Sequence, residues 1–146
     1  MIVKVLTRKE IPLIYKLGKK EFVGENWLSE KFLYNSLRRK CVSFVALEKN
    51  KIVGAIMVDV LDKPKAWVFY FIVDKRYRKM GIGTKLIKGV EKNLPRGYNV
   101  LLTDFEKKDY SARKFYKKIG FKEVAKIKSW FGLRHYGLIY EKILKN

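Results

Sequence analysis

The hydrophobic and polar positions of the N-terminal half predict four strands. Residues 2–6, 42–47, 52–61 and 66–73 are short runs rich in β-branched and aromatic residues and bounded by turn residues. Lys49-Asn50 separates the second run from the third and is a hairpin signal. We therefore expect three consecutive antiparallel strands to deliver the chain to residue 73.

Two helices are predicted between the first and second strands. Thr7 and Glu10 have the spacing of a capping box, and Pro12 suits a helix start. Apolar residues then recur at helical spacing to about Phe22. Ser29 is a good N-cap for a second helix that ends near Arg39.

A glycine-containing loop follows the strand at 66–73 and leads directly into a helix. Leu86, Ile87, Val90 and Leu94 recur on one helical face, and Pro95 follows. Gly81 and Gly83 let the backbone N–H groups of the loop turn toward a common point, at the positive end of the helix dipole. This arrangement predicts an anion site.

The spacing of the loop excludes two nucleotide motifs. Leu86 stands where G-x-G-x-x-G needs its third glycine, and no Gly-Lys-Ser/Thr sequence of a Walker loop is present. The remaining pattern is Arg-x-x-Gly-x-Gly over residues 78–83. The predicted anion site therefore belongs to neither of these two nucleotide-binding loops.

A second patterned segment runs from Asp109 to Phe121. Ala112, Phe115, Tyr116 and Ile119 share one helical face, Asp109 or Ser111 can cap its start, and Gly120 ends it before another strand. A strand at 100–105 precedes this helix. It should lie parallel to the strand at 66–73, through a right-handed crossover. A last strand is expected from about Gly137 to Leu144.

Together the two motifs resemble those of the GNAT family of N-acetyltransferases. The loop at 78–83, entered from Val73, resembles the family's acetyl-coenzyme A loop, and residues 109–121 resemble its Asn-x-x-Ala-x-x-x-Tyr-x-x-x-Gly-Phe motif. Lys75 replaces the usual proline and Asp109 replaces the asparagine. The motif layout is most similar to that of ribosomal-protein N-terminal acetyltransferases. The resemblance implies an α/β GNAT fold, a mixed central sheet flanked by helices, in one domain over residues 1–146.

The resemblance also implies acetyl-coenzyme A as co-substrate. Backbone amides of the loop would hold its pyrophosphate, and the strand end before the loop would bind its pantetheine arm and face the thioester oxygen. The implied coenzyme-binding residues are Phe71, Ile72, Val73, Arg78, Lys79, Met80, Gly81, Ile82, Gly83, Thr84 and Asp109.

Tyr116 is the implied general acid for the departing thiolate. Its ordinary pKa of ~10 exceeds the ~8.5 of a thiol, so proton donation needs nearby positive charge to lower the pKa of the phenol. The abundant lysines offer such charge. The alternative for Tyr116 is a core tyrosine without chemistry, because it lies on the apolar face of its helix.

Asp104 is the implied general base, twelve residues before Tyr116, since residues 66–73 contain no carboxylate. An aspartate of pKa ~3.9 is a poor base unless desolvation raises its pKa or it works through water. An ordinary polar strand end is the alternative. His135 has a better matched pKa, but a lone histidine in a loop is more often incidental.

Two further segments would border the acceptor side by resemblance. Glu21, Phe22, Glu25 and Trp27 are candidate substrate contacts, with core packing or solvated charge as the alternative. The aromatic loop at 129–136 would lie across the same side, or form a hairpin closed by aromatic packing.

Charge is the outlier of the composition. With 34 Lys plus Arg and 14 Asp plus Glu among 146 residues, the net charge is +20. Such a surface attracts polyanions, so a weak association with nucleic acid is expected, and a solvated lysine surface without such a partner is the alternative. The same charge favours an acceptor that is neutral or acidic, or a basic acceptor that is already bound to nucleic acid. A weakly basic catalytic residue can deprotonate an α-amine of pKa ~8 more easily than a lysine amine of pKa ~10.4, so an α-amino acceptor suits it better.

Other function classes are disfavoured. One Cys and one His cannot form a nitrogen and sulfur metal site. No apolar run reaches the ~18 residues of a membrane span, and the N-terminus lacks a signal-peptide pattern, so we expect a cytoplasmic protein without membrane partners. The sequence thus predicts transfer of acetyl from acetyl-coenzyme A to a protein N-terminus, a lysine or a small-molecule amine. Its rivals are a coenzyme A- or nucleic-acid-binding module without turnover, and a structural protein that keeps the fold.

Overall fold

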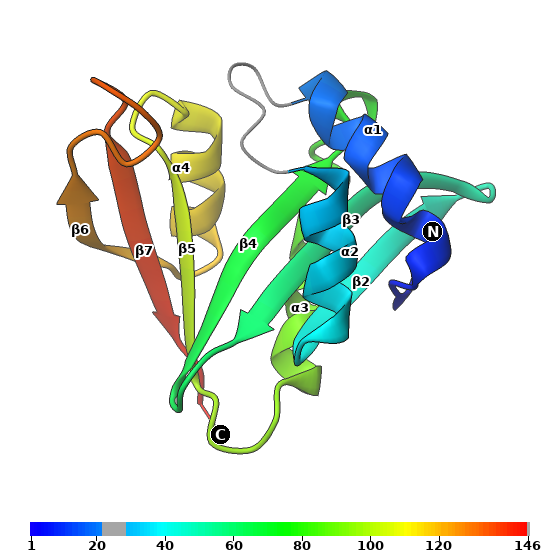
Figure 1. Cartoon of the computed structure of the whole chain (residues 1–146), viewed down its shortest axis with the longest axis horizontal. Coiled ribbons are helices and arrows are strands. Elements are labelled where there is room, and N and C mark those ends of the chain that lie inside the picture. The colour runs from blue at the N-terminus through cyan, green and yellow to red at the C-terminus, as the bar shows by residue number, and fades with distance from the viewer. Residues whose placement is uncertain (22–28, 146) are drawn as a thin grey trace. The chain divides into compact units, whose positions relative to one another are not determined.

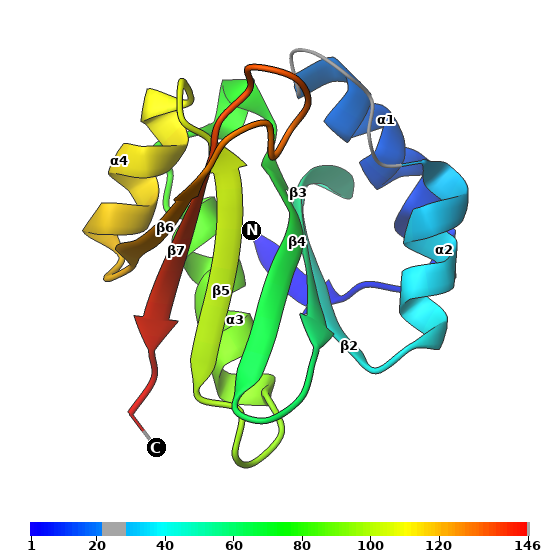
Figure 2. The same ribbon diagram turned by 60° about the vertical axis from the view of Figure 1, so that its left-hand side comes forward.

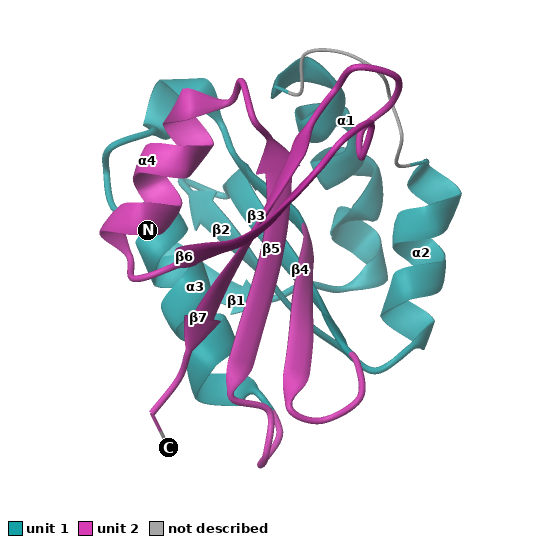
Figure 3. Ribbon diagram, turned by 90° about the vertical axis from the view of Figure 1, so that its left-hand side faces the viewer, with its two compact units in different colours: residues 1–60, 70–94 teal, residues 61–69, 95–146 magenta. Residues whose placement is uncertain are grey.

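The structure is a computed structural model that describes residues 1–21 and 29–145. Its strands belong to a mixed sheet in the order β1-β2-β3-β4-β5-β7-β6 (Figure 1). The described chain forms two compact units, residues 1–60 with 70–94 and residues 61–69 with 95–146, coloured separately in Figure 3. Strand β4 contributes its first residues to the second unit and its last residues to the first.

In the first unit, β1 pairs antiparallel with β2, and β2 pairs antiparallel with β3. Lys49 and Asn50 both have positive φ, 49° and 64°, which is the backbone of the tight hairpin turn predicted there. The end of β4 lies beside β3 in the sheet, and just after β4 the Asp74 N–H donates to the Val53 carbonyl of β3. The elements of this unit are β1 (Ile2–Val5), α1 (Ile11–Glu21), α2 (Glu30–Arg38), β2 (Cys41–Glu48), β3 (Lys51–Val60), the end of β4 (Lys65–Val73) and α3 (Ile82–Asn93).

Helices cover both faces of the sheet in this unit. Strand β3 is buried at every position from Val53 to Val58, which requires apolar cover on each side. Figure 2 shows α3 on one face and α1 with α2 on the other. The helix starts are those predicted: Glu10 closes a capping box with Thr7 ahead of α1, and the Ser29 hydroxyl accepts from the Phe32 N–H at the start of α2.

The second unit begins with the parallel pairing of β4 and β5, from Lys65 with Val100 to Val68 with Thr103. This confirms the predicted strand, helix and parallel strand order. Strand β7 then pairs antiparallel with β5 and with β6. The remaining elements of this unit are β5 (Val100–Glu106), α4 (Tyr110–Lys118), β6 (Lys122–Ile127) and β7 (Gly137–Ile143).

Strand β5 has one fully buried face and one half-buried face. Leu101, Thr103 and Phe105 are buried, whereas Asp104 and Glu106 alternate with them and are partly exposed. Helix α4 lies on one side of β5 and β7, and the connection from β6 to β7 crosses the other side (Figure 2). The two faces of β5 therefore meet different partners.

Most predicted element bounds agree with the structure to within two residues. The helical face expected on α4 is only partly correct: Tyr116 is buried, but Ala112, Phe115 and Ile119 are half-buried. Leu94 is the C-cap of α3 instead of part of its apolar face. Among the described residues, no helix is long and apolar enough to cross a membrane.

Candidate active site

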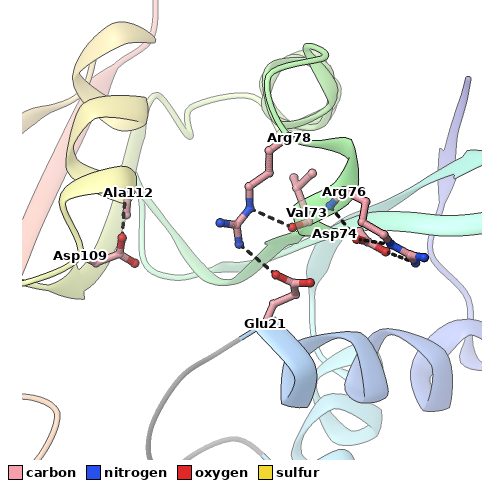
Figure 4. Close-up of polar contacts among 7 residues, drawn as sticks. All are labelled: Glu21, Val73, Asp74, Arg76, Arg78, Asp109 and Ala112. Carbon is pink, nitrogen blue, oxygen red and sulfur yellow. Dashed lines mark hydrogen bonds and ion pairs between the residues drawn. The ribbon is translucent and has the colours of Figure 1, made fainter.

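The loop between β4 and α3 begins with a compact turn at Asp74. Its carboxylate accepts from the Arg76 backbone N–H at 3.0 Å and from the Arg76 guanidinium at 2.9 Å (Figure 4). These bonds with Arg76 lower the pKa of Asp74 from its ordinary 3.8 to about 2. The turn forms a short 3₁₀ helix, Lys75–Tyr77, with Asp74 as its N-cap.

The loop then turns through two residues with left-handed backbone. Lys79 has φ 65° and Gly81 has φ 78°, and Gly81 is the N-cap of α3. The first helical hydrogen bond runs from the Lys85 N–H to the Gly81 carbonyl. The N–H groups of Ile82, Gly83 and Thr84 therefore form the positive end of the helix. The Ile82 side chain is buried, so this residue offers only its backbone to a ligand.

Arg78 makes contacts that the sequence did not indicate. Its Nε donates to the Val73 carbonyl at 3.3 Å, and its Nη2 forms an ion pair with Glu21 Oε2 at 3.3 Å (Figure 4). The Glu21 side chain is only 5% exposed. A predicted coenzyme residue and a predicted acceptor contact are thus partners of each other, and Glu21 partly neutralises the charge of Arg78.

The other predicted coenzyme residues of the first unit have varied surroundings. Ile72 is buried, Phe71 and Val73 are half-buried, and Met80 is exposed. In the second unit, the Asp109 carboxylate accepts from the Ala112 N–H at 3.0 Å (Figure 4), so it caps α4 as the sequence suggested.

Tyr116 lies in an aromatic cluster on the buried face of β5. Its ring stacks on Phe105 at 5.4 Å and meets Phe121 edge to face at 5.1 Å, and its side chain is 6% exposed. The Thr103 hydroxyl donates to the phenol oxygen at 3.1 Å. Burial raises the pKa of Tyr116. The condition for easy proton donation, a pKa lowered by nearby lysines, is therefore not met, because desolvation and the charges of Asp104 and Asp109 act against ionisation.

Asp104 lies on the other face of β5. The Trp130 Nε1–H donates to Asp104 Oδ2 at 2.7 Å. Burial raises the pKa of Asp104, and hydrogen bonds from Trp130 and Trp67 oppose that increase. The desolvation that a catalytic aspartate needs is thus present at this position.

The Tyr116 and Asp104 side chains contact opposite sides of one strand. Thr103 and Asp104 are neighbours in β5, and successive residues of a strand point to opposite faces. Tyr116 bonds to Thr103 on the buried face, whereas Trp130 bonds to Asp104 on the half-buried face.

His135 is paired with a carboxylate two residues beyond Asp104. Its Nδ1 lies 2.8 Å from Glu106 Oε1. Glu106, Trp130 and Thr103 were not among the predicted site residues. The strand alternation would have placed Glu106 on the same face as Asp104. Trp130 belongs to the aromatic loop at 129–136 that was expected on the acceptor side, but no sequence pattern pairs it with Asp104.

Three candidate substrate contacts, Phe22, Glu25 and Trp27, lie outside the described residues. Within residues 1–21 and 29–145, no group of three or more His, Cys, Asp or Glu residues could hold a metal ion.

A family model described as the acetyltransferase (GNAT) family matches residues 11–121. The chain belongs to the GNAT acetyltransferase family. The match includes the loop at 78–84, Asp104 and Tyr116. A comparison with curated proteins found no significant match for this GNAT chain.

Solved structures show the same fold. Ard1 from Thermoplasma volcanium has a TM-score of 0.90 at 18% identity, covering 99% of this chain and 98% of that chain. The ribosomal-protein-S18-alanine N-acetyltransferase from Escherichia coli has a TM-score of 0.86 at 19% identity, covering 99% and 94%. An aminoglycoside 6'-N-acetyltransferase complexed with coenzyme A has a TM-score of 0.84 at 16% identity, covering 100% and 98%. At these identities the likeness establishes the fold of this GNAT chain.

Proposed function

We propose that this GNAT protein transfers acetyl from acetyl-coenzyme A to the α-amino group of a protein or peptide. The observation that carries the proposal is the start of α3. There Gly81 adopts a left-handed backbone and leaves the N–H groups of residues 82–84 at the positive helix end, in a chain of this family. An anionic coenzyme is the ligand that such a cradle suits.

The coenzyme would be held mainly by backbone groups. The N–H groups of residues 82–84 would bind its pyrophosphate, and the end of β4, Phe71 to Val73, would bind its pantetheine arm. When bound, the coenzyme supplies a thioester carbonyl as acetyl donor. Arg78 would contribute a charge that Glu21 moderates through their 3.3 Å ion pair.

The proposed chemistry needs a base and an acid. Asp104 accepts a proton from the acceptor ammonium, directly or through water, and its raised pKa supports this role. The amine nitrogen then bonds to the carbonyl carbon, the carbon–sulfur bond breaks, and the sulfur takes a proton from Tyr116. The nitrogen gives its remaining extra proton to the resulting tyrosinate, which restores Tyr116, and Asp104 releases its proton to water. In the bond with Thr103, the Tyr116 oxygen accepts, so that bond does not use the phenol proton.

Two arguments favour an α-amine as acceptor. At pH 7 about a tenth of an α-amine of pKa ~8 is neutral, but fewer than one lysine amine in a thousand is. A similar structure is that of a ribosomal-protein-S18-alanine N-acetyltransferase. The net charge of +20 favours acceptors that are neutral or acidic near the reacting amine. A lysine or a small-molecule amine, such as the aminoglycoside named for another similar structure, is the alternative.

The first experiment is calorimetric titration of acetyl-coenzyme A at two salt concentrations, with Gly83→Glu as the control. We expect saturable binding that the added carboxylate at the helix start abolishes. Peptides with free or blocked α-amines and with or without lysine then identify the acceptor. Asp104→Asn should remove most activity and leave coenzyme binding intact.

The charge of +20 favours a second candidate, a module that binds nucleic acid without turnover. In that case RNA or duplex DNA binds with a steep dependence on salt, and acetyl-coenzyme A gives no heat at low salt.

A further inference from the structure

Trp130 lies between a carboxylate and a glycine on the half-buried side of β5. Its indole N–H reaches Asp104 in β5 at 2.7 Å. Its ring lies against Gly137, the first residue of β7, which pairs with Glu106 in β5. Trp130 itself belongs to the connection between β6 and β7, so this connection folds back onto the strand that carries Asp104.

Only a glycine at position 137 allows this seat. A Cβ added there would lie 2.4 Å from Trp130 Cδ1 and 2.6 Å from its Cγ, closer than side chains tolerate. Trp130 is 43% exposed, so no core surrounds its ring. Its position is set instead by the glycine beneath it and by the carboxylate that it contacts.

A second contact holds the same connection on the same strand. His135 Nδ1 lies 2.8 Å from Glu106 Oε1, two residues along β5 from Asp104. The 129–136 segment is thus attached to one face of β5 at both Asp104 and Glu106. This spacing matches the two-residue repeat of a strand.

We propose that Trp130, seated on Gly137, is a positioning residue that holds the Asp104 carboxylate in the orientation needed to accept the proton of the acceptor amine. The inference rests on the proposed function. Without the Trp130 donor, the Asp104 carboxylate keeps the hydrogen bond from Trp67 but loses the contact at Oδ2 that fixes its orientation, and catalysis depends on a well-placed proton acceptor. Trp130 does not itself touch the reacting atoms.

The hydrogen bond from Trp130 also affects the pH range in which Asp104 is ionised and can act as a base. Burial raises the pKa of Asp104, and the hydrogen bond from Trp130 lowers it. Loss of this bond should therefore move the pKa of Asp104 further upward. A base that must be ionised then works only at higher pH.

Two variants test the proposal in different ways. Trp130→Phe keeps an aromatic ring and deletes the N–H donor. Gly137→Ala keeps the indole and displaces it from its seat. Val124→Ala is the control, because Val124 lies in β6, outside the 129–136 connection, and is 48% exposed.

We expect both test variants to shift the acid limb of the kcat/KM profile upward by about one pH unit, equivalent to about 1.4 kcal/mol. Below that limb, kcat/KM should fall about tenfold, with the KM for acetyl-coenzyme A unchanged and Val124→Ala like wild type. A role confined to folding would lower the melting temperature without moving the limb. An unmoved limb in folded Trp130→Phe and Gly137→Ala overturns the proposal.

An NMR measurement separates this inference from the proposed function. In the unaltered protein, the Trp130 indole N–H resonance should titrate with the Asp104 carboxyl carbon, and Gly137→Ala should abolish that coupling. If the protein shows no acetyltransferase activity, the proposed function fails. The shared pH dependence of the two resonances still reports whether Trp130 and Asp104 are in contact. If the chemical shift of the Trp130 indole N–H does not change as Asp104 titrates, the positioning role is overturned.

Discussion

Arg78 forms an ion pair with Glu21, with 3.3 Å between Nη2 and Oε2, and so ties the loop before α3 to the end of α1. The carboxylate side is almost buried and the guanidinium is partly exposed. The ion pair therefore affects both the stability of the first unit and the positive charge of the loop that is available to bind an anion.

Arg78→Met should destabilise the protein by about 1 to 3 kcal/mol, because it leaves the Glu21 carboxylate without this partner in a nearly buried position. Glu21→Gln should cost less and should tighten acetyl-coenzyme A binding several-fold, since Arg78 is then no longer neutralised. Urea unfolding and calorimetry measure the two effects. If the stability changes of Arg78→Met and Glu21→Gln add up to that of the double variant, the two residues are not directly coupled.

Gly81→Ala should cost about 1 kcal/mol through its left-handed backbone alone, because no atom lies within 4 Å of an added Cβ. It should also weaken coenzyme binding by shifting the first turn of α3. Gly89→Ala is the matched control within α3. Its Cβ would meet the Phe44 ring at 3.6 Å, an ordinary contact, so helix propensity should stabilise it by about 0.5 to 1 kcal/mol. Equal effects at the two glycines would refute the backbone argument.

Tyr116→Phe and Thr103→Val each remove the 3.1 Å hydrogen bond, and each should cost about 1 kcal/mol of stability. Only Tyr116→Phe also removes the phenol proton. If Tyr116 is the acid, kcat falls far more in Tyr116→Phe than in Thr103→Val, with similar coenzyme affinity. Equal loss in both variants would assign Tyr116 to packing.

Asp74 should contribute stability that depends on pH. Its pKa falls from 3.8 to about 2 on folding, so the contribution is fully present above about pH 4 and is lost as the pH falls through 2. Asp74→Asn should therefore be less stable than wild type at pH 7 and approach it near pH 2. Urea unfolding across this range measures the difference, with Asp62→Asn at an exposed turn as control. A difference that does not change with pH would rule out this linkage.

The sequence by itself determined the elements and the loop. The capping box of Thr7 with Glu10, the Lys49-Asn50 turn and the glycine at the start of α3 are local features, and local backbone preferences act over a few residues. The parallel β4 and β5 pair followed from the order of strand, helix and strand.

Only the tertiary structure decided which side chains meet. Glu21 and Arg78 are 57 positions apart and Asp104 and Trp130 are 26 apart, and no periodicity connects such distant positions. The pKa of Tyr116 also depended on the fold: the lysine-rich composition only made a lower pKa possible, whereas burial raises it. Composition describes the whole surface, whereas a pKa depends on the few atoms around one group.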